Sequence, residues 1–411
     1  MDILIIPIPL FDENVAVKAY LLKNRRGNEF LDGTGNASLD KAMVSPPLEM
    51  LNIVGLEALT MGKSIFVPVT RFMLLSRLEI QSNQPAEKLV FLIDGSEIEN
   101  AGNYADNMAR LKNLGYSFAI QNIKNLKSVE PLLAHCSFVF WDARVFGERE
   151  RELQTYFSNT YNRLANVYAN IESLEQFEEI SATRRGLFEG DFYRLPVSKG
   201  MKEEVEPLHV NLINLLNTVQ EENFDFDEIS GIIEHDPALA VSLLRVVNSV
   251  HFSFKEKVKS INQAVVLLGQ KEVTKWITTA VTRQLGANKP GELTRLALVR
   301  ARFAEEVAVL FGLEDFSQSI FLMGLFSALD AMLDLPMEDA LKQVRVSDDI
   351  YNTLVNRNGP YNPVYQFILD YESANWTNVS RMMIVRDVHT AEVYKAYLGA
   401  MLWYNKLLRE E

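Results

Sequence analysis

The chain has 411 residues, a formal net charge of −13 and a single cysteine, Cys136. This length allows two domains, and an acidic chain has no basic excess with which to bind nucleic acid in general. One cysteine cannot form an intrachain disulfide, which fits a reducing compartment. No stretch approaches the roughly 20 apolar residues of a membrane span. The sequence therefore predicts a cytoplasmic protein that binds neither nucleic acid nor membrane.

The first half of the chain alternates predicted strands with predicted helices. Its opening residues are apolar, lack a basic leader and predict a strand instead of a signal peptide. Strands are expected at residues 3–11, 15–22, 64–69, 89–93, 117–120, 138–141 and 167–171, and helices at 46–62, 103–113, 148–162 and 174–181. Such alternation is typical of a parallel α/β sheet or barrel.

The second half is expected to be all-helical. The charged stretch at 197–206 marks the predicted domain boundary. Beyond it, apolar residues recur at helical spacing and no strand is expected. Helices are predicted at residues 210–219, 226–233, 271–285 and 293–311. We therefore expect an α/β barrel domain at residues 1–198 and a helical domain at residues 199–411.

One segment of the second half, residues 232–254, carries a helix signal of its own. Asp236 is a good N-cap, and Pro237 follows at the position where a missing N–H costs nothing. An apolar stripe then continues at helical spacing. Asn248 and Ser249 break this pattern near its end, where either side chain can bond back to the backbone.

A second segment follows at residues 260–269. Ser260 and Gln263 have the spacing of a capping box, and Gly269 is a natural helix stop. Together the two segments resemble the signature of the HDOD domain, a helical signalling module related to HD-type phosphohydrolases that usually lacks their metal site. Ser327 and Ala328 stand where active HD hydrolases have His-Asp. The resemblance therefore implies no metal site here, and Asp236 is interpreted as a cap and not as a ligand.

The first half resembles an EAL domain, the barrel that hydrolyses cyclic di-GMP. The family's Tyr-Glu-Leu-Leu motif appears as Tyr20-Leu21-Leu22, so its glutamate is missing. The resemblance places Pro68 and Leu92 at two further metal-ligand positions, and Gln121-Asn122 at the paired aspartates. Acids remain only at Asp142 and Glu172, while the family's final Gln-Gly-Tyr becomes Glu189-Gly190-Asp191. The resemblance runs over residues 1–195.

These replacements bear directly on catalysis. The EAL reaction uses two divalent cations, which need several carboxylate and amide oxygens at fixed positions. We therefore expect no enzyme activity and no cofactor. The expected function is a scaffold or regulator in cyclic-di-GMP-linked control of motility or biofilm, acting by protein–protein contact. A cyclic-di-GMP receptor and a residual phosphodiesterase remain as alternatives.

The expected partners are other signalling proteins, such as cyclic-di-GMP enzymes or sensor kinases, and a homodimer is left open. Residues 251–259 combine Phe252 and Phe254 with Lys255 in an otherwise acidic chain. Aromatic residues beside charges are typical of interface anchors. The alternative is a solvated loop whose two phenylalanines pack into the core.

Overall fold

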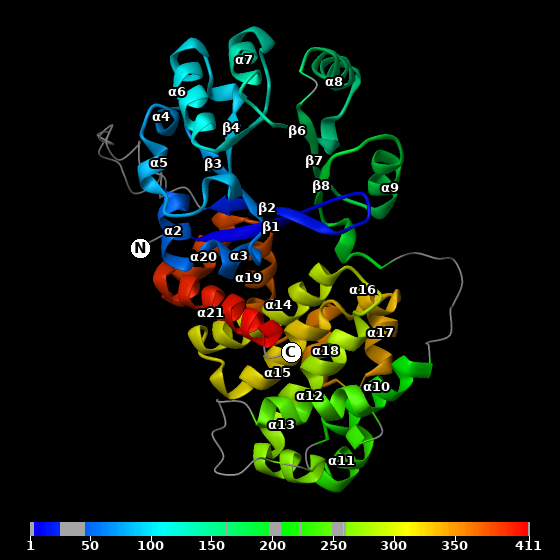
Figure 1. Ribbon diagram of the computed structural model, residues 1–411. Helices are drawn as coiled ribbons and strands as arrows, with labels where there is room; N and C mark the ends of the chain where they lie inside the picture. Colours follow the sequence, from blue (N-terminus) through cyan, green and yellow to red (C-terminus); the bar gives the residue numbers. More distant parts are fainter. Residues whose placement is uncertain are drawn as a thin grey trace. The chain divides into compact units, whose positions relative to one another are not determined.

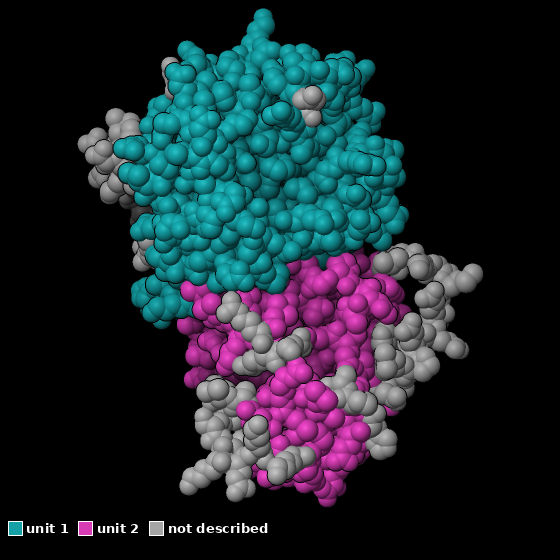
Figure 2. All heavy atoms as spheres, in the orientation of Figure 1, with its two compact units in different colours: residues 1–193, 370–395 teal, residues 194–369, 396–411 magenta. Residues whose placement is uncertain are grey.

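The computed structural model describes residues 4–24, 46–161, 163–196, 207–221, 224–234, 236–248, 258, 260–344 and 346–409. The chain forms two compact units (Figures 1 and 2). Unit 1 comprises Met1–Tyr193 and Asp370–Lys395, and unit 2 comprises Arg194–Leu369 and Ala396–Glu411. This division differs from the expected domains in two places: the first boundary lies at Tyr193 instead of residue 198, and residues Asp370–Lys395 belong to the barrel unit.

Among the described residues of unit 1, eight strands form a closed barrel in sequence order. The first strand is antiparallel to both of its neighbours, and the remaining neighbours are parallel. The strands are β1 (Ile5–Phe11), β2 (Val17–Asn24), β3 (Ser64–Val69), β4 (Leu89–Asp94), β5 (Ser117–Gln121), β6 (Phe138–Asp142), β7 (Ala165–Ile171) and β8 (Leu187–Gly190). The barrel confirms the predicted α/β architecture, although the short strand β8 was not predicted.

Aromatic rings fill part of the barrel interior. The Phe66 ring on β3 lies 5.0 Å from that of Phe138 and 5.5 Å from that of Phe140, both on β6. Since β3 and β6 are not neighbours in the barrel, these rings meet inside it. Side chains alternate between the two faces of a strand, so Pro68 and Asp142 face inward with Phe66 and Phe140.

Helices follow the strands along the barrel. They are α2 (Pro46–Val54), α3 (Leu56–Thr60), α4 (Arg71–Leu74), α5 (Leu78–Gln81), α6 (Gly102–Asn113), α7 (Leu126–Leu133), α8 (Glu148–Thr160) and α9 (Leu174–Thr183). The single helix expected at 46–62 is wrong, because Gly55 adopts a φ of 83° between α2 and α3. A residue in that conformation cannot continue a right-handed helix.

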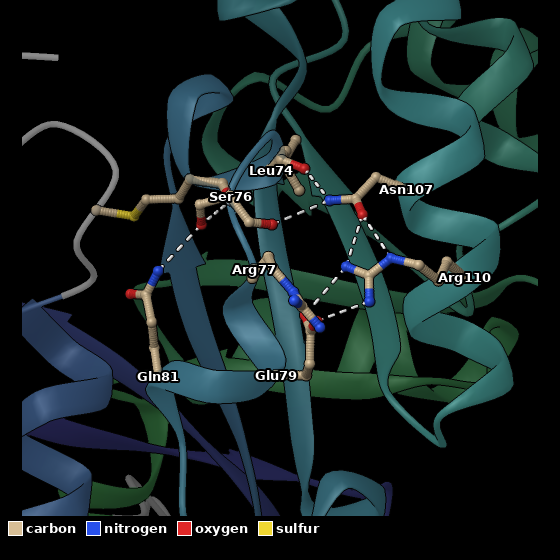
Figure 3. A network of polar contacts seen from close by, with 8 residues as sticks. Leu74, Ser76, Arg77, Glu79, Gln81, Asn107 and Arg110 are labelled. Atoms are coloured by element: carbon tan, nitrogen blue, oxygen red, sulfur yellow. Dashed lines mark hydrogen bonds and ion pairs between the residues drawn. The ribbon is translucent and has the colours of Figure 1, made fainter. Parts of the chain in front are cut away.

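A polar network joins the α4–α5 segment to α6 (Figure 3). Arg110 donates to both carboxylate oxygens of Glu79, at 2.8 and 3.0 Å, and to the Asn107 Oδ1 at 2.7 Å. Asn107 in turn donates its amide to the Ser76 carbonyl at 3.2 Å. The hydrogen bonds from Arg110 lower the pKa of Glu79 to about 2. The network therefore fixes the loop between α4 and α5 against α6.

The C-terminal segment of unit 1 packs against the start of the barrel. It includes the end of α19 (Asn362–Glu372), all of α20 (Trp376–Arg386) and the start of α21 (Thr390–Arg409). Tyr371 is fully buried, and its hydroxyl donates to the Ile5 carbonyl of β1 at 2.9 Å. The Trp376 ring lies edge-on to that of Tyr371, with the centroids 5.3 Å apart. All residues of β1 are buried, and Tyr371 contacts the first of them.

Unit 2 is helical throughout its described residues, as predicted. Its helices include α10 (Pro207–Thr218), α11 (Phe226–Glu234), α12 (Pro237–Val247), α13 (Ile261–Leu285), α14 (Gly291–Leu310), α15 (Ser317–Phe326), α16 (Leu329–Leu333), α17 (Met337–Gln343) and α18 (Asp348–Leu354). Helices α14 and α15 approach closely at Gly324, where an added Cβ would lie 2.8 Å from the Ala301 Cα. None of the described helices is both long and apolar enough to cross a membrane.

Candidate functional site

With the exception of Tyr20, the sequence-predicted barrel residues lie on the carboxyl-terminal halves of the strands or just beyond them. Because β2 to β8 run parallel, these ends surround one mouth of the barrel, which is where barrel enzymes place their active sites. The structure brings to this mouth Leu21 from β2, Pro68 from β3, Leu92 from β4, Gln121 and Asn122 from β5, Asp142 from β6, Glu172 from β7 and Glu189 from β8. Tyr20 does not join them, because it precedes Leu21 in the first half of β2 and its side chain faces away from the barrel interior.

Apolar side chains occupy three of these positions. Leu21 and Leu92 are buried, with 7% and 3% of their surface exposed, and Pro68 lies between them on β3. None of the three side chains offers an oxygen or nitrogen to a cation. The buried ring of Phe140 lies nearby on β6 and contacts Phe66 inside the barrel. This part of the mouth is therefore apolar.

Asp142 ends β6 and is held by an arginine two residues later. Arg144 donates its Nε to Asp142 Oδ1 at 3.0 Å and its Nη2 to Asp142 Oδ2 at 2.7 Å. The Arg144 backbone N–H also donates to Oδ1, at 3.1 Å. The hydrogen bond from the Arg144 guanidinium is the main cause that lowers the pKa of Asp142. Both carboxylate oxygens are thus bonded to a cation of the chain itself.

Glu189, on β8, is buried and also has a cationic partner. The Lys23 Nζ lies 3.3 Å from Glu189 Oε1, and the Asn170 backbone N–H donates to Oε2 at 2.8 Å. Asn170 has a positive φ of 62°, a conformation that asparagine tolerates better than most residues. Glu189 therefore joins β2, β7 and β8 at the mouth.

A third carboxylate, Asp94, ends β4. It accepts a hydrogen bond from the Asn122 amide at 2.9 Å and another from the Ser96 backbone N–H at 2.9 Å. Three mouth residues, Asp94, Lys23 and Arg144, were not predicted from the sequence. A signal was present for each: Lys23 follows Leu21 on the same face of β2, and the other two lie at or just after predicted strand ends.

The donor set at the mouth does not fit a pair of divalent cations. Among the residues that the structure describes, no group of three His, Cys, Asp or Glu side chains is placed to hold a metal ion. Asp142 and Glu189 already bond to Arg144 and Lys23, whose positive charges would repel a nearby cation. Glu172 is exposed beyond the end of β7. Two such ions need more free oxygen ligands than remain here.

The signature segment of unit 2 has the predicted cap. The Leu239 backbone N–H donates to Asp236 Oδ1 at 3.0 Å, and Pro237 is the first residue of α12. This confirms Asp236 as an N-cap. Asn248 donates to the carbonyls of Leu244 and Val258, at 2.8 and 2.9 Å, and its Oδ1 accepts from the Val258 N–H at 2.8 Å.

Asn248 therefore joins the end of α12 to Val258, which lies three positions before the start of α13. Ser260 caps α13 through the Gln263 N–H at 3.2 Å, and Gly269 interrupts that helix with a φ of 74°. Both features were predicted. Four other predicted residues, Ser249, Phe252, Phe254 and Lys255, lie outside the described residues, so the two alternatives for 251–259 both stand.

The hydrogen bond from the Leu239 N–H to Asp236 leads to a prediction about the stability of unit 2. Asp236→Ala should lower the free energy of unfolding of unit 2 by about 0.5–2 kcal/mol, because it removes a bonded partner of the Leu239 N–H. Asp236→Asn should be close to neutral, since asparagine caps as well as aspartate. Denaturant unfolding of the three proteins measures both differences. Equal losses in the two variants would mean that the carboxylate charge matters and that the capping explanation is wrong.

The position of the HD metal pair is occupied differently in unit 2. The buried Arg300 of α14 donates to the Ser327 hydroxyl at 2.6 Å and to the Ser327 carbonyl at 3.4 Å. Asp330 lies three residues further on, and its burial raises the pKa of its carboxyl. A guanidinium and a hydroxyl therefore interact beside the place where the resemblance would put a metal.

Comparisons with known proteins agree with this description of unit 2. The family model of the HDOD domain matches residues 206–346. The chain contains an HDOD domain. The match includes the Asp236 cap, Asn248 and the Ser327 region, and it ends before the C-terminal segment of unit 1.

Two relatives extend beyond the HDOD domain. The uncharacterized protein YuxH of Bacillus subtilis is 25% identical over 411 residues, which cover 97% of each chain. The cyclic di-GMP phosphodiesterase CdgJ of Vibrio cholerae is 26% identical over 301 residues, covering 73% of this chain and 69% of CdgJ. Among solved structures, a standalone EAL protein of Vibrio cholerae O395 in a cyclic-di-GMP-bound form is 16% identical, with a TM-score of 0.36 over 46% of this chain and 90% of that chain.

Proposed function

We propose that this protein is a non-catalytic regulator linked to cyclic-di-GMP signalling, which acts by binding other signalling proteins. The observation that carries the proposal is the state of the barrel mouth. There, Leu21, Pro68 and Leu92 offer no ligand atoms, and the carboxylates of Asp142 and Glu189 are bonded to Arg144 and Lys23. A mouth in this state lacks the means to bind and activate water with two metal ions.

The ion pairs also compensate the charge of two mouth carboxylates within the chain itself. Glu189 is buried, and an unpaired buried carboxylate is costly. Lys23 supplies the compensating charge at 3.3 Å, and the Asn170 N–H supplies a second partner. Arg144 pairs with Asp142, which is only partly buried, so this pair compensates a smaller cost. Lys23 and Arg144 thus neutralise carboxylate charges that divalent cations would otherwise neutralise.

The link to cyclic di-GMP rests on likeness to other proteins. CdgJ, the relative that shares 26% identity over most of this chain, is named as a cyclic di-GMP phosphodiesterase. The EAL resemblance of the sequence points the same way, and the HDOD domain is a signalling module. A cyclic-di-GMP receptor is the second candidate, because Lys23 and Arg144 lie at the mouth and each has more N–H donors than its carboxylate partner uses, which a phosphate could accept.

The test is an activity assay with a binding arm. Purified full-length protein is incubated with cyclic di-GMP and either Mg²⁺ or Mn²⁺, and product is followed by chromatography beside an active EAL phosphodiesterase. We expect no product above the buffer background. Turnover that co-elutes with the protein and is lost in the Asp142→Asn, Glu189→Gln double variant would contradict the proposal. Calorimetric binding of the dinucleotide without turnover would favour the receptor.

A further inference from the structure

Helix α20, drawn in orange in Figure 1, carries aliphatic side chains on its exposed face as well as on its buried face. Its inner face carries Val379 and Met383, which are 0% and 4% exposed. Its outer face carries Arg381, Ile384 and Val385, which share one side of the helix at spacings of three and four residues. We call these three residues the α20 stripe.

The two aliphatic side chains of the α20 stripe stand out by their exposure. Ile384 is 81% exposed and Val385 is 76% exposed, the highest values among the exposed large hydrophobic residues that the structure describes. Single exposed aliphatic residues are common on protein surfaces. Ile384 and Val385 are adjacent, and the other face of their helix is already buried in the core. They therefore provide apolar area that a partner can remove from water.

Charge indicates the kind of partner. Arg381 is exposed one turn before Ile384, and no ion pair or hydrogen bond joins its guanidinium to another described residue. The only acid close in sequence, Asp387, lies past the helix at its left-handed C-cap. The stripe is therefore a local positive and apolar site on a chain whose net charge is −13.

We propose that the α20 stripe docks an acidic amphipathic helix of a partner protein. Apolar residues of that helix would cover Ile384 and Val385, and a carboxylate beside them would pair with Arg381. Arginine and buried apolar residues are the usual anchors of such contacts, and amphipathic helices commonly bind in this way. The stripe lies outside the HDOD match at 206–346 and includes none of the barrel-mouth residues, so the proposal does not depend on whether the barrel is catalytic.

The experiment uses full-length protein and two fluorescent peptides of about 20 residues, a length that supports a helix. Both peptides carry leucines at helical spacing, flanked by glutamates in one and by lysines in the other. Fluorescence anisotropy should show binding of the glutamate peptide only. The Ile384→Ser, Val385→Ser double variant should weaken that binding at least about tenfold, a typical loss for an interface anchor. Arg381→Glu should weaken the glutamate peptide and strengthen the lysine peptide.

A matched control replaces another highly exposed aliphatic residue of the same unit. Ile80→Ser, at a position 71% exposed in α5, should leave peptide binding unchanged. Thermal melting confirms that every variant is folded, and the charge reversal at Arg381 tests the proposal even where the double variant is unstable. Equal binding of the two peptides, or no change in the stripe variants, would overturn the proposal.

Two other occupants are distinguished in the same experiment. Self-association that disappears in the double variant, measured by analytical ultracentrifugation without peptide, would assign the stripe to a second copy of the chain. Binding to vesicles containing phosphatidylserine, without binding to the glutamate peptide, would assign it to an anionic lipid surface. Either result replaces the acidic helix as the occupant.

Discussion

Gly190→Ala is expected to destabilise the barrel by about 3 kcal/mol or more, enough to deplete the folded state of a marginally stable domain. Gly190 ends β8 opposite Ile171 of β7, and the Ile171 carbonyl accepts a hydrogen bond from the Asp191 N–H at 2.9 Å. A Cβ on Gly190 would lie 2.0 Å from that carbonyl oxygen and 2.7 Å from the Ile171 carbonyl carbon. Since these are backbone atoms, only a shift of the strands could relieve the clash.

Denaturant unfolding of the full-length protein, followed with hydrogen exchange of β7 and β8, measures this effect. Gly102→Ala in the same unit is the matched control, because an added Cβ there would lie no closer than 3.4 Å to any other group. That substitution is expected to be neutral or mildly stabilising in α6. Native-like stability of the Gly190 variant would show that β8 moves easily and that the close approach is not required.

The barrel was largely predictable because its signals are local. Apolar runs such as those of β4 and β5, separated by amphipathic segments, predict strands and helices without knowledge of their partners. The caps at Asp236 and Ser260 were predictable for the same reason, since a cap involves residues only three positions apart. β8 was missed because it has four residues, too few for a periodic pattern.

The site was only partly predictable because its energetics depend on residues far apart in sequence. The apolar replacements at Leu21, Pro68 and Leu92 followed from the EAL resemblance. That Lys23 pairs with Glu189, 166 residues away, could not be predicted from either residue alone. The pairing decides whether Glu189 is available as a ligand. Composition and periodicity carry no such information.

The assignment of the C-terminal segment to the barrel unit was not predictable either. Residues 370–395 have helical patterns like those of the preceding chain, so the sequence favoured one continuous helical domain at 199–411. The structure instead places Asp370–Lys395 in unit 1 through the contact between Tyr371 and Ile5, which are 366 residues apart. A fragment cut at the predicted boundary would therefore lack part of the barrel's packing.

Tyr371 gives the most direct measure of that packing. Tyr371→Ala should lower the free energy of unfolding of unit 1 by about 3–5 kcal/mol, because it removes a large and fully buried ring. Tyr371→Phe should lower it by about 1–2 kcal/mol, because only the hydroxyl donor to the buried Ile5 carbonyl is lost. Both variants should raise hydrogen exchange in β1, at the opposite end of the sequence.

The matched control is Tyr365→Phe. Tyr365 lies on the same helix α19 and is also buried, with 3% of its surface exposed. Tyr365 contacts Arg357 through its ring, with the guanidinium 4.8 Å from the centroid, so loss of its hydroxyl should leave β1 exchange unchanged. Helix α14 of unit 2 serves as an internal reference in each protein. If Tyr371→Ala accelerated exchange in α14 and left β1 protected, residues 370–395 would belong energetically to the helical domain, as the sequence alone suggested, and the barrel would be complete without them.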